Sequence, residues 1–97
     1  MEVKVLYFDG CPHWRTAADR LAALQAEMGF ELTRQEVETP EEAERFGFRG
    51  SPTIQVNGID AFGPDDAPVT FACRVYETPE GAAGSPTIEQ LRMVMSR

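Results

Sequence analysis

The sequence predicts one α/β domain over residues 1–97, with the element order β-α-β-α-β-β-α and helices on both faces of a four-stranded mixed sheet. Three observations lead to this prediction. Short runs rich in β-branched and aromatic residues alternate with stretches whose apolar residues recur at helical spacing. The helical stretches begin or end at residues that suit a helix cap. The length of 97 residues, 42% of them hydrophobic, matches one small domain with its own core.

The first third of the chain predicts a right-handed β-α-β unit. Residues 3–8 (VKVLYF) are apolar at nearly every position, which is typical of a central strand covered on both faces. Pro12 suits the first position of a helix, and Gly29 suits the position just after its end. Alternation over residues 30–37 predicts a second, more exposed strand. Helical spacing predicts the buried face of the helix: Trp14, Ala17, Ala18, Leu21, Leu24 and Met28.

The middle of the chain predicts a short helix and a strand. Thr39 suits the N-cap of this helix, with Pro40 at its first position and Glu42 completing a capping box. Residues 51–56 (SPTIQV) place a proline directly before a predicted strand, since proline is tolerated at the start of a strand but not in its middle. The Asn57-Gly58 dipeptide predicts a turn that makes the last two strands antiparallel.

The last third of the chain predicts a strand and a helix separated by loops. Residues 59–68 and 77–84 are rich in residues that favour loops, whereas residues 69–76 (VTFACRVY) between them have the composition of a strand. Ser85 and Pro86 predict the cap and start of the last helix. Its predicted buried face consists of Ile88, Leu91 and Met95.

The charge and the cysteine content exclude several classes of protein. The chain has 16 acidic and 9 basic residues, a net charge of −7, which argues against the basic face of a nucleic-acid-binding module. No apolar run approaches the roughly 20 residues that span a bilayer, and the N-terminus does not have the pattern of a signal peptide. Two cysteines are too few for a disulfide framework or a cysteine-rich zinc site. We therefore expect a cytoplasmic protein with reduced thiols, no membrane or nucleic-acid partner and no bound metal.

Cys11 is the first candidate for chemistry because it follows a buried strand and precedes a helix. The positive end of a helix dipole stabilises a thiolate, which lowers a thiol pKa from about 8.5 to roughly 3.5–7.5. His13, two residues on, is the only histidine and is predicted to stabilise this thiolate or carry a proton. The alternative is that Cys11 is a small buried hydrophobic residue and His13 an ordinary surface or core residue. The strand-to-helix context favours the reactive thiol.

Two motifs flank this predicted thiol site. Cys11-Pro12-His13-Trp14 opens the first helix, and Gly50-Ser51-Pro52-Thr53 precedes the third strand. With the element order, these motifs resemble the thioredoxin-like superfamily, and in particular glutaredoxin-like small bacterial thioredoxin-family proteins with a Cys-Pro-His-Trp variant motif. The resemblance covers nearly the whole chain. It implies that Pro52 is cis and lies against Cys11, and that the backbone of Ser51 is free to pair with a peptide or glutathione thiol partner.

The chain departs from the Cys-Pro-x-Cys motif because Trp14 stands where the second, resolving cysteine would be. Trp14 either begins the core face of its helix or forms an aromatic lid beside the thiol. Three outcomes stay open: a monothiol mechanism with glutathione as co-substrate, Cys73 as a distant resolving thiol, or a redox-inactive domain. Cys73 is expected about 10 Å short of the active site, beyond the roughly 7 Å between Cα atoms that a disulfide allows. We therefore expect Cys73 to be a buried core residue.

The sequence thus predicts a thiol–disulfide oxidoreductase or monothiol redox protein. Cys11 and His13 are the predicted catalytic residues. Ser51, Pro52, Trp14 and Arg49 are predicted to bind the substrate, a small thiol or disulfide or a protein thiol, with Arg49 the best-placed cation for an anion. The alternatives are a redox-inactive interaction domain and a protein that detoxifies electrophiles or mercury-type metals with both thiols. The sequence does not predict the oligomeric state.

Overall fold

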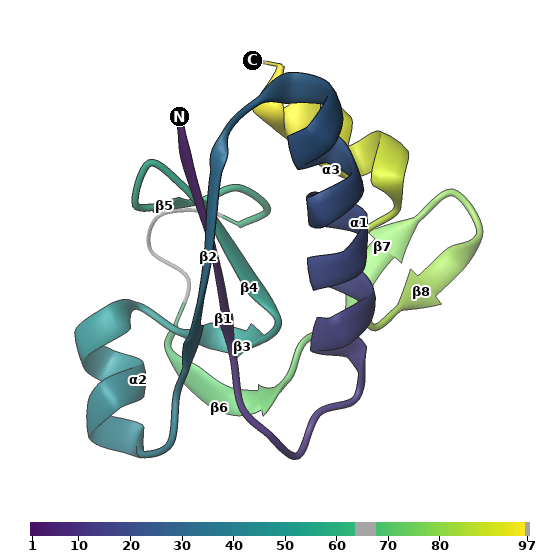
Figure 1. Ribbon diagram of the computed structural model, residues 1–97. Helices are drawn as coiled ribbons and strands as arrows, with labels where there is room; N and C mark the ends of the chain where they lie inside the picture. The colour runs from purple at the N-terminus through teal and green to yellow at the C-terminus, as the bar shows by residue number, and fades with distance from the viewer. Residues whose placement is uncertain (64–67, 97) are drawn as a thin grey trace.

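A four-stranded mixed sheet forms the centre of the computed structural model, which describes residues 1–63 and 68–96 (Figure 1). Its strand order is β2 (Glu31–Glu36), β1 (Glu2–Tyr7), β4 (Thr53–Val56) and β5 (Ile59–Asp60). The pair β1–β2 is parallel, whereas β1–β4 and β4–β5 are antiparallel. The predicted α/β class, the mixed sheet and the central position of the first strand are therefore confirmed.

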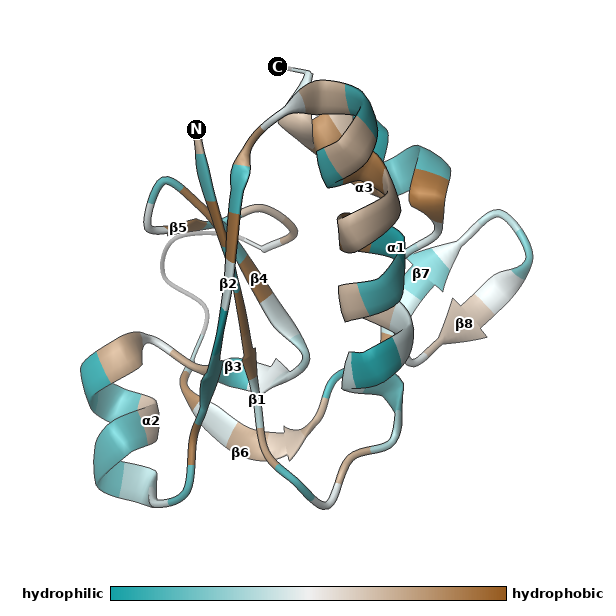
Figure 2. Cartoon of the chain, viewed as in Figure 1, coloured by the Kyte–Doolittle hydropathy of each residue, from teal (hydrophilic) through white to brown (hydrophobic). Residues whose placement is uncertain are grey.

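Helices lie on both faces of this sheet (Figure 1). Helix α1 (His13–Met28) and helix α3 (Ile88–Met95) cover one face, and the short helix α2 (Pro40–Phe46) lies on the other. Successive residues of a strand point to opposite faces, so Val5 belongs to the α1–α3 core and Leu6 to the core beside α2. The strands at the centre of the sheet carry its strongly hydrophobic residues, which are brown in Figure 2.

The ends of α1 and α2 largely follow the predicted capping residues. Gly29 ends α1 in the left-handed conformation, and Pro12 is its N-cap rather than its first residue. Thr39 caps α2 by accepting a hydrogen bond from the Glu42 amide (3.1 Å). The predicted capping box is wrong in one detail, since the Glu42 carboxylate accepts from the Glu38 amide instead of the Thr39 amide.

The predicted start of the last helix is also wrong. Thr87 is the N-cap of α3, and it forms a complete capping box with Gln90. The Ser85 hydroxyl instead accepts a hydrogen bond from Arg20 (3.3 Å). The helix begins after Thr87 and not after Ser85, because a capping box satisfies two amide groups at the helix start, whereas a serine alone satisfies one. Leu91 and Met95 are buried as predicted, and Ile88 is partly buried.

The strand predicted to follow the Asn57-Gly58 turn is wrong. Asn57 and Gly58 form a turn with positive φ angles of 52° and 84°, but this turn joins β4 to β5 rather than to residues 69–76. The predicted loop at residues 59–68 therefore begins with a strand, and its residues 64–67 lie outside the described part. Residues 51–56 divide at Pro52 into the end of β3 (Arg49–Ser51) and β4.

The strand predicted at residues 69–76 lies outside the central sheet. Its first part, β6 (Thr70–Cys73), pairs in parallel with β3. Its last residue begins β7 (Tyr76–Thr78), which forms a hairpin with β8 (Gly81–Ala83) where a loop was expected. A loop was predicted because short, glycine-rich strands have little strand propensity of their own.

Gly50 allows β3 and β6 to approach each other closely. It has a φ of 106°, and a Cβ atom there would lie 2.9 Å from Cβ of Arg74 and 3.2 Å from the carbonyl oxygen of Ala72. Any other residue would therefore be strained and would push β6 away. This close packing places Cys73 directly opposite Ser51. No helix in the described part of the chain has the length and apolar character needed to cross a membrane.

Candidate functional site

Cys11 lies at the junction between β1 and α1, as predicted, but its side chain is completely buried. Its amide donates to the carbonyl of Phe8 (3.2 Å), which closes the turn after β1. Its thiol donates to the carbonyl of Ser51 (3.4 Å). The structure therefore joins the two sequence motifs at one point, although they lie 40 residues apart.

Cys73 is brought to the same point from β6. It is exposed and pairs with Ser51 in the β3–β6 register, and its thiol lies near that of Cys11. This proximity to Cys11 is the main reason why the pKa of Cys73 is raised, and burial adds to the shift. The prediction of a buried core residue far from Cys11 is wrong, because β6 pairs with β3 instead of extending the central sheet.

Ser51 and Pro52 form the segment that lies next to the two thiols. The Ser51–Pro52 peptide bond is cis, as the resemblance implied. Both residues are buried, and the Ser51 carbonyl accepts a hydrogen bond from the amide of Arg74 (3.0 Å). The implied free backbone at Ser51 is therefore wrong, since the segment that follows β6 already occupies it. Ser51 Oγ accepts a hydrogen bond from the amide of Phe8 (3.3 Å), which connects the Ser51–Pro52 segment to the residue that follows β1.

Trp14 belongs to the buried face of α1. It is 7% exposed and its ring stacks on Tyr7 with the ring centroids 3.9 Å apart. The guanidinium groups of Arg15 and Arg34 lie over the same ring, at 5.4 and 5.6 Å from its centroid. Of the two interpretations of Trp14, the geometry favours the core face over the lid. Its predicted role in substrate binding stays a prediction.

His13 lies beside an open pocket of about 620 Å³ that also contains Cys73 and Val75. Its ring packs against Gly84, where a Cβ atom would lie only 2.2 Å from the imidazole. Within the described residues, His13 makes no hydrogen bond to either sulfur atom. The structure therefore places it near Cys73 in the pocket, and its predicted catalytic role stays a prediction.

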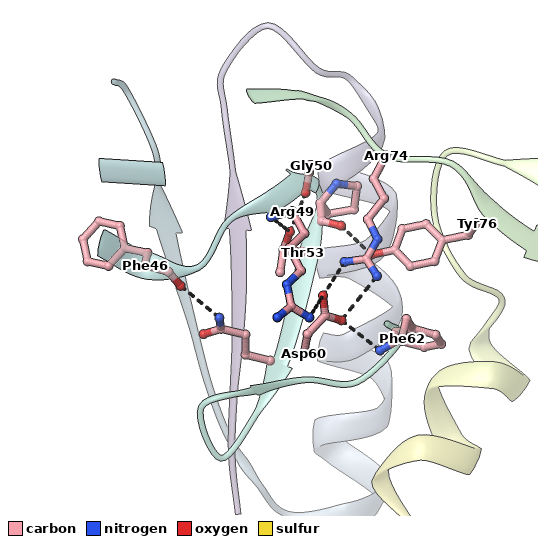
Figure 3. Close-up of polar contacts among 10 residues, drawn as sticks. Phe46, Arg49, Gly50, Thr53, Asp60, Phe62, Arg74 and Tyr76 are labelled. Atoms are coloured by element: carbon pink, nitrogen blue, oxygen red, sulfur yellow. Dashed lines mark hydrogen bonds and ion pairs between the residues drawn. The ribbon is translucent and has the colours of Figure 1, made fainter. Parts of the chain in front are cut away.

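Asp60 is a residue of this region that the sequence analysis missed. Its carboxylate is buried and accepts two hydrogen bonds from Arg74 (2.8 and 3.3 Å) and one from Arg49 (3.5 Å), as Figure 3 shows. Arg49, predicted to bind an anionic substrate, thus directs its guanidinium to Asp60. Arg74 follows Cys73 in the chain, so Asp60 anchors the end of β6. A single aspartate after a hairpin turn carries no pattern that predicts this contact.

Tyr76 stabilises the Ser51–Pro52 segment through Pro52, and replacing Tyr76 tests this stabilisation. Its hydroxyl donates a hydrogen bond to the buried carbonyl of Pro52. We expect Tyr76→Phe to lower the free energy of unfolding by about 1–2 kcal/mol at neutral pH, because this carbonyl loses its partner. The matched control is Tyr7→Phe, since the Tyr7 hydroxyl makes no hydrogen bond within the described residues. Urea unfolding of both variants measures the difference, and equal stabilities would contradict the prediction.

Tyr76 is also expected to lower the free energy of unfolding at alkaline pH. Burial raises the pKa of Tyr76 well above its ordinary value of about 10. Above pH 10 the unfolded chain therefore loses this proton while the folded protein keeps it, and the free energy of unfolding decreases as the pH rises. Below pH 10 both states keep the proton, so the effect is absent there.

The chain matches no family model, and comparison with curated proteins and with solved structures finds no match. The position of the two thiols beside Ser51 is therefore the main indication of what the protein does.

Proposed function

We propose that this protein is a thiol–disulfide oxidoreductase of the thioredoxin-like type that uses Cys11 and Cys73 as its dithiol pair. The observation that carries the proposal is the position of two free cysteines beside one residue, Ser51. Cys73 pairs with Ser51 across β3 and β6, and the Cys11 thiol donates to the carbonyl of the same Ser51, so one residue links the positions of the two cysteines.

Several features of the chain support the thioredoxin-like assignment. The β1-α1-β2 unit carries Cys11 just before its helix, and the cis peptide bond at Pro52 lies beside this thiol. The missing second cysteine of the motif is the main departure. Cys73 compensates for it, because the fold brings a thiol from β6 to Cys11 where Trp14 has no thiol to offer.

The proposed reaction converts a dithiol into a disulfide and reduces a substrate. The substrate disulfide takes two electrons and two protons from Cys11 and Cys73 and leaves as two thiols, while a bond forms between the two cysteine sulfur atoms. An external thiol, such as glutathione, then reduces the protein disulfide and is itself oxidised. The reaction runs in either direction according to the potentials of the two couples.

Mild oxidation of the reduced protein tests this proposal. We expect one equivalent of diamide to produce a monomer whose mass is lower by two hydrogen atoms, with no thiol left to alkylate after unfolding. Cys11→Ser and Cys73→Ser are the matched controls, and neither forms this monomer. A wild-type protein that stays reduced, or that forms only disulfide-linked dimers, would contradict the proposal and favour the redox-inactive interaction domain.

The same position of the two thiols supports a second candidate function, the capture of a soft cation such as Hg²⁺ by two thiolates. Soft thiolate ligands favour such ions. We expect the wild type to take up one equivalent of Hg²⁺ and each serine variant to bind it much more weakly, measured by mass spectrometry in a thiol-containing buffer. Equal retention by the wild type and the variants would exclude this candidate.

A further inference from the structure

The two thiols of the proposed pair differ in their access to solvent. The Cys11 side chain is 0% exposed, whereas Cys73 belongs to a strand in which all four residues are exposed. β6 covers the approach to Cys11 because it is held against β3 and the end of β1. Arg74 donates to Ser51 (3.0 Å), and Phe71 stacks on Phe8 with the ring centroids 5.2 Å apart. An external disulfide therefore meets Cys73 before it meets Cys11.

The open pocket described above lies on the Cys73 side of the pair. Its walls come from the first turns of α1, the end of β6 and the β7–β8 hairpin, which lie side by side in Figure 1. Cys73 lines it together with His13, Gly84 and Val75, a residue that is 67% exposed. Cys11 is not among the residues that line it. A small molecule bound here therefore lies against Cys73, whereas Cys11 is not part of the wall.

We propose that the mixed disulfide of the exchange reaction forms on Cys73, in the pocket between α1 and the β7–β8 hairpin, and that the buried Cys11 resolves it. This inference rests on the proposed function and reverses the roles that the sequence assigns to the two cysteines. The substrate class is a small disulfide, or an exposed disulfide of a protein, that enters this pocket.

The exchange takes two steps, one at each cysteine. Cys73 loses its proton, and its thiolate attacks one sulfur of the substrate R–S–S–R, so a Cys73–S–R bond forms and the first RS⁻ leaves with that proton. The Cys11 thiolate, after losing its own proton, attacks the Cys73 sulfur. The Cys11–Cys73 bond forms, and the second RS⁻ leaves and takes up the second proton. The substrate gains two electrons and the dithiol loses two.

The position of the two thiols suits Cys11 for the second step. The neighbouring Cys11 thiol raises the pKa of Cys73. Cys11 lies next to Cys73 before any substrate binds, and it is therefore the nucleophile of the resolving step. The higher pKa of Cys73 decreases its thiolate fraction but increases the intrinsic reactivity of that thiolate. Access then decides which sulfur reacts first, since a buried thiolate cannot reach an external disulfide.

The experiment compares the two single-cysteine variants with 4,4′-dithiodipyridine, a small uncharged disulfide. We expect Cys11→Ser, which retains Cys73, to react about tenfold faster or more than Cys73→Ser at the same pH. Release of thiopyridone measures the rate in a stopped-flow instrument. Circular dichroism and thermal unfolding establish first that both variants are folded. A Cys73→Ser variant that reacts as fast as Cys11→Ser, or faster, would overturn the inference.

A second measurement uses the reduced wild-type protein and does not depend on the variants. After a brief pulse of iodoacetamide, peptide mapping is expected to find the label on Cys73 before it is found on Cys11. Label that accumulates first on Cys11 would overturn the inference. If only this inference is wrong, diamide still produces the Cys11–Cys73 disulfide. If the proposed function itself is wrong, no such disulfide forms.

Discussion

Replacing Asp60 with asparagine is expected to lower the free energy of unfolding by about 3 kcal/mol. The Asp60 side chain is 2% exposed, and its partners Arg49 and Arg74 are 16% and 13% exposed. Asparagine keeps the shape of the side chain and can still accept from the Phe62 amide, which donates to Asp60 at 2.9 Å. Asparagine removes the negative charge, however, so the largely buried guanidinium groups of Arg49 and Arg74 lose the carboxylate that they share.

Thermal unfolding measures this effect, with a decrease in Tm of roughly 12 °C or more for a domain of this size. Glu27→Gln is the matched control. Glu27 also forms a two-point contact with an arginine, Arg92, but this pair is exposed and is screened by solvent. We expect the control to change Tm little. Similar losses in the two variants would contradict the assignment of Asp60 as the buried anchor of this cluster.

Asp60→Asn should also change the behaviour of the thiols. The carboxylate holds Arg74, and the Arg74 amide holds the segment after β6 against Ser51. Weakening this anchor lets Cys73 move away from Cys11. We therefore expect slower formation of the Cys11–Cys73 disulfide in the variant than in Glu27→Gln, measured with diamide under conditions in which both proteins are folded.

Forming the Cys11–Cys73 disulfide is expected to stabilise the protein by up to about 4 kcal/mol. The bond would close a loop of about 60 residues, and the loss of conformational freedom in the unfolded chain accounts for a stabilisation of this size. The two thiols already lie beside the same residue, Ser51, in the reduced protein, so we expect little rearrangement to oppose the bond. Urea unfolding of the oxidised and reduced forms measures the difference.

Two serine variants control for other effects of oxidation. Cys11→Ser and Cys73→Ser, treated in the same way, should unfold at the same urea concentration before and after diamide. An oxidised wild type that is less stable than the reduced form would show that the bond strains the β3–β6 pairing. That result would contradict the arrangement of the two thiols described here.

Local sequence patterns predicted most of the elements that one segment can specify by itself. Gly29 ended the first helix, and Thr39 capped the second, because each residue satisfies backbone groups a few positions away. The apolar run at residues 3–8 indicated the central strand for a similar reason, since a strand covered on both faces needs apolar residues on both.

The site depended on pairings that no local pattern encodes. Asn57-Gly58 predicted a turn correctly, but the turn does not specify which strand follows it, and β5 took the place expected for residues 69–76. The partner of β6 was decided at Gly50, where the absence of a side chain allows close approach. This pairing moved Cys73 from an expected core position to an exposed position beside Cys11.

Local patterns along the chain thus predicted the α/β class, the central β1-α1-β2 unit and the position of Cys11 at the start of a helix. These features depend on hydrophobic periodicity and capping, which act over a few residues. Three other features became visible only in the folded domain: Cys73 lies near Cys11, β6 covers Ser51, and Asp60 anchors Arg74. Those contacts join segments that are distant in the chain, and their formation depends on the packing of the whole domain.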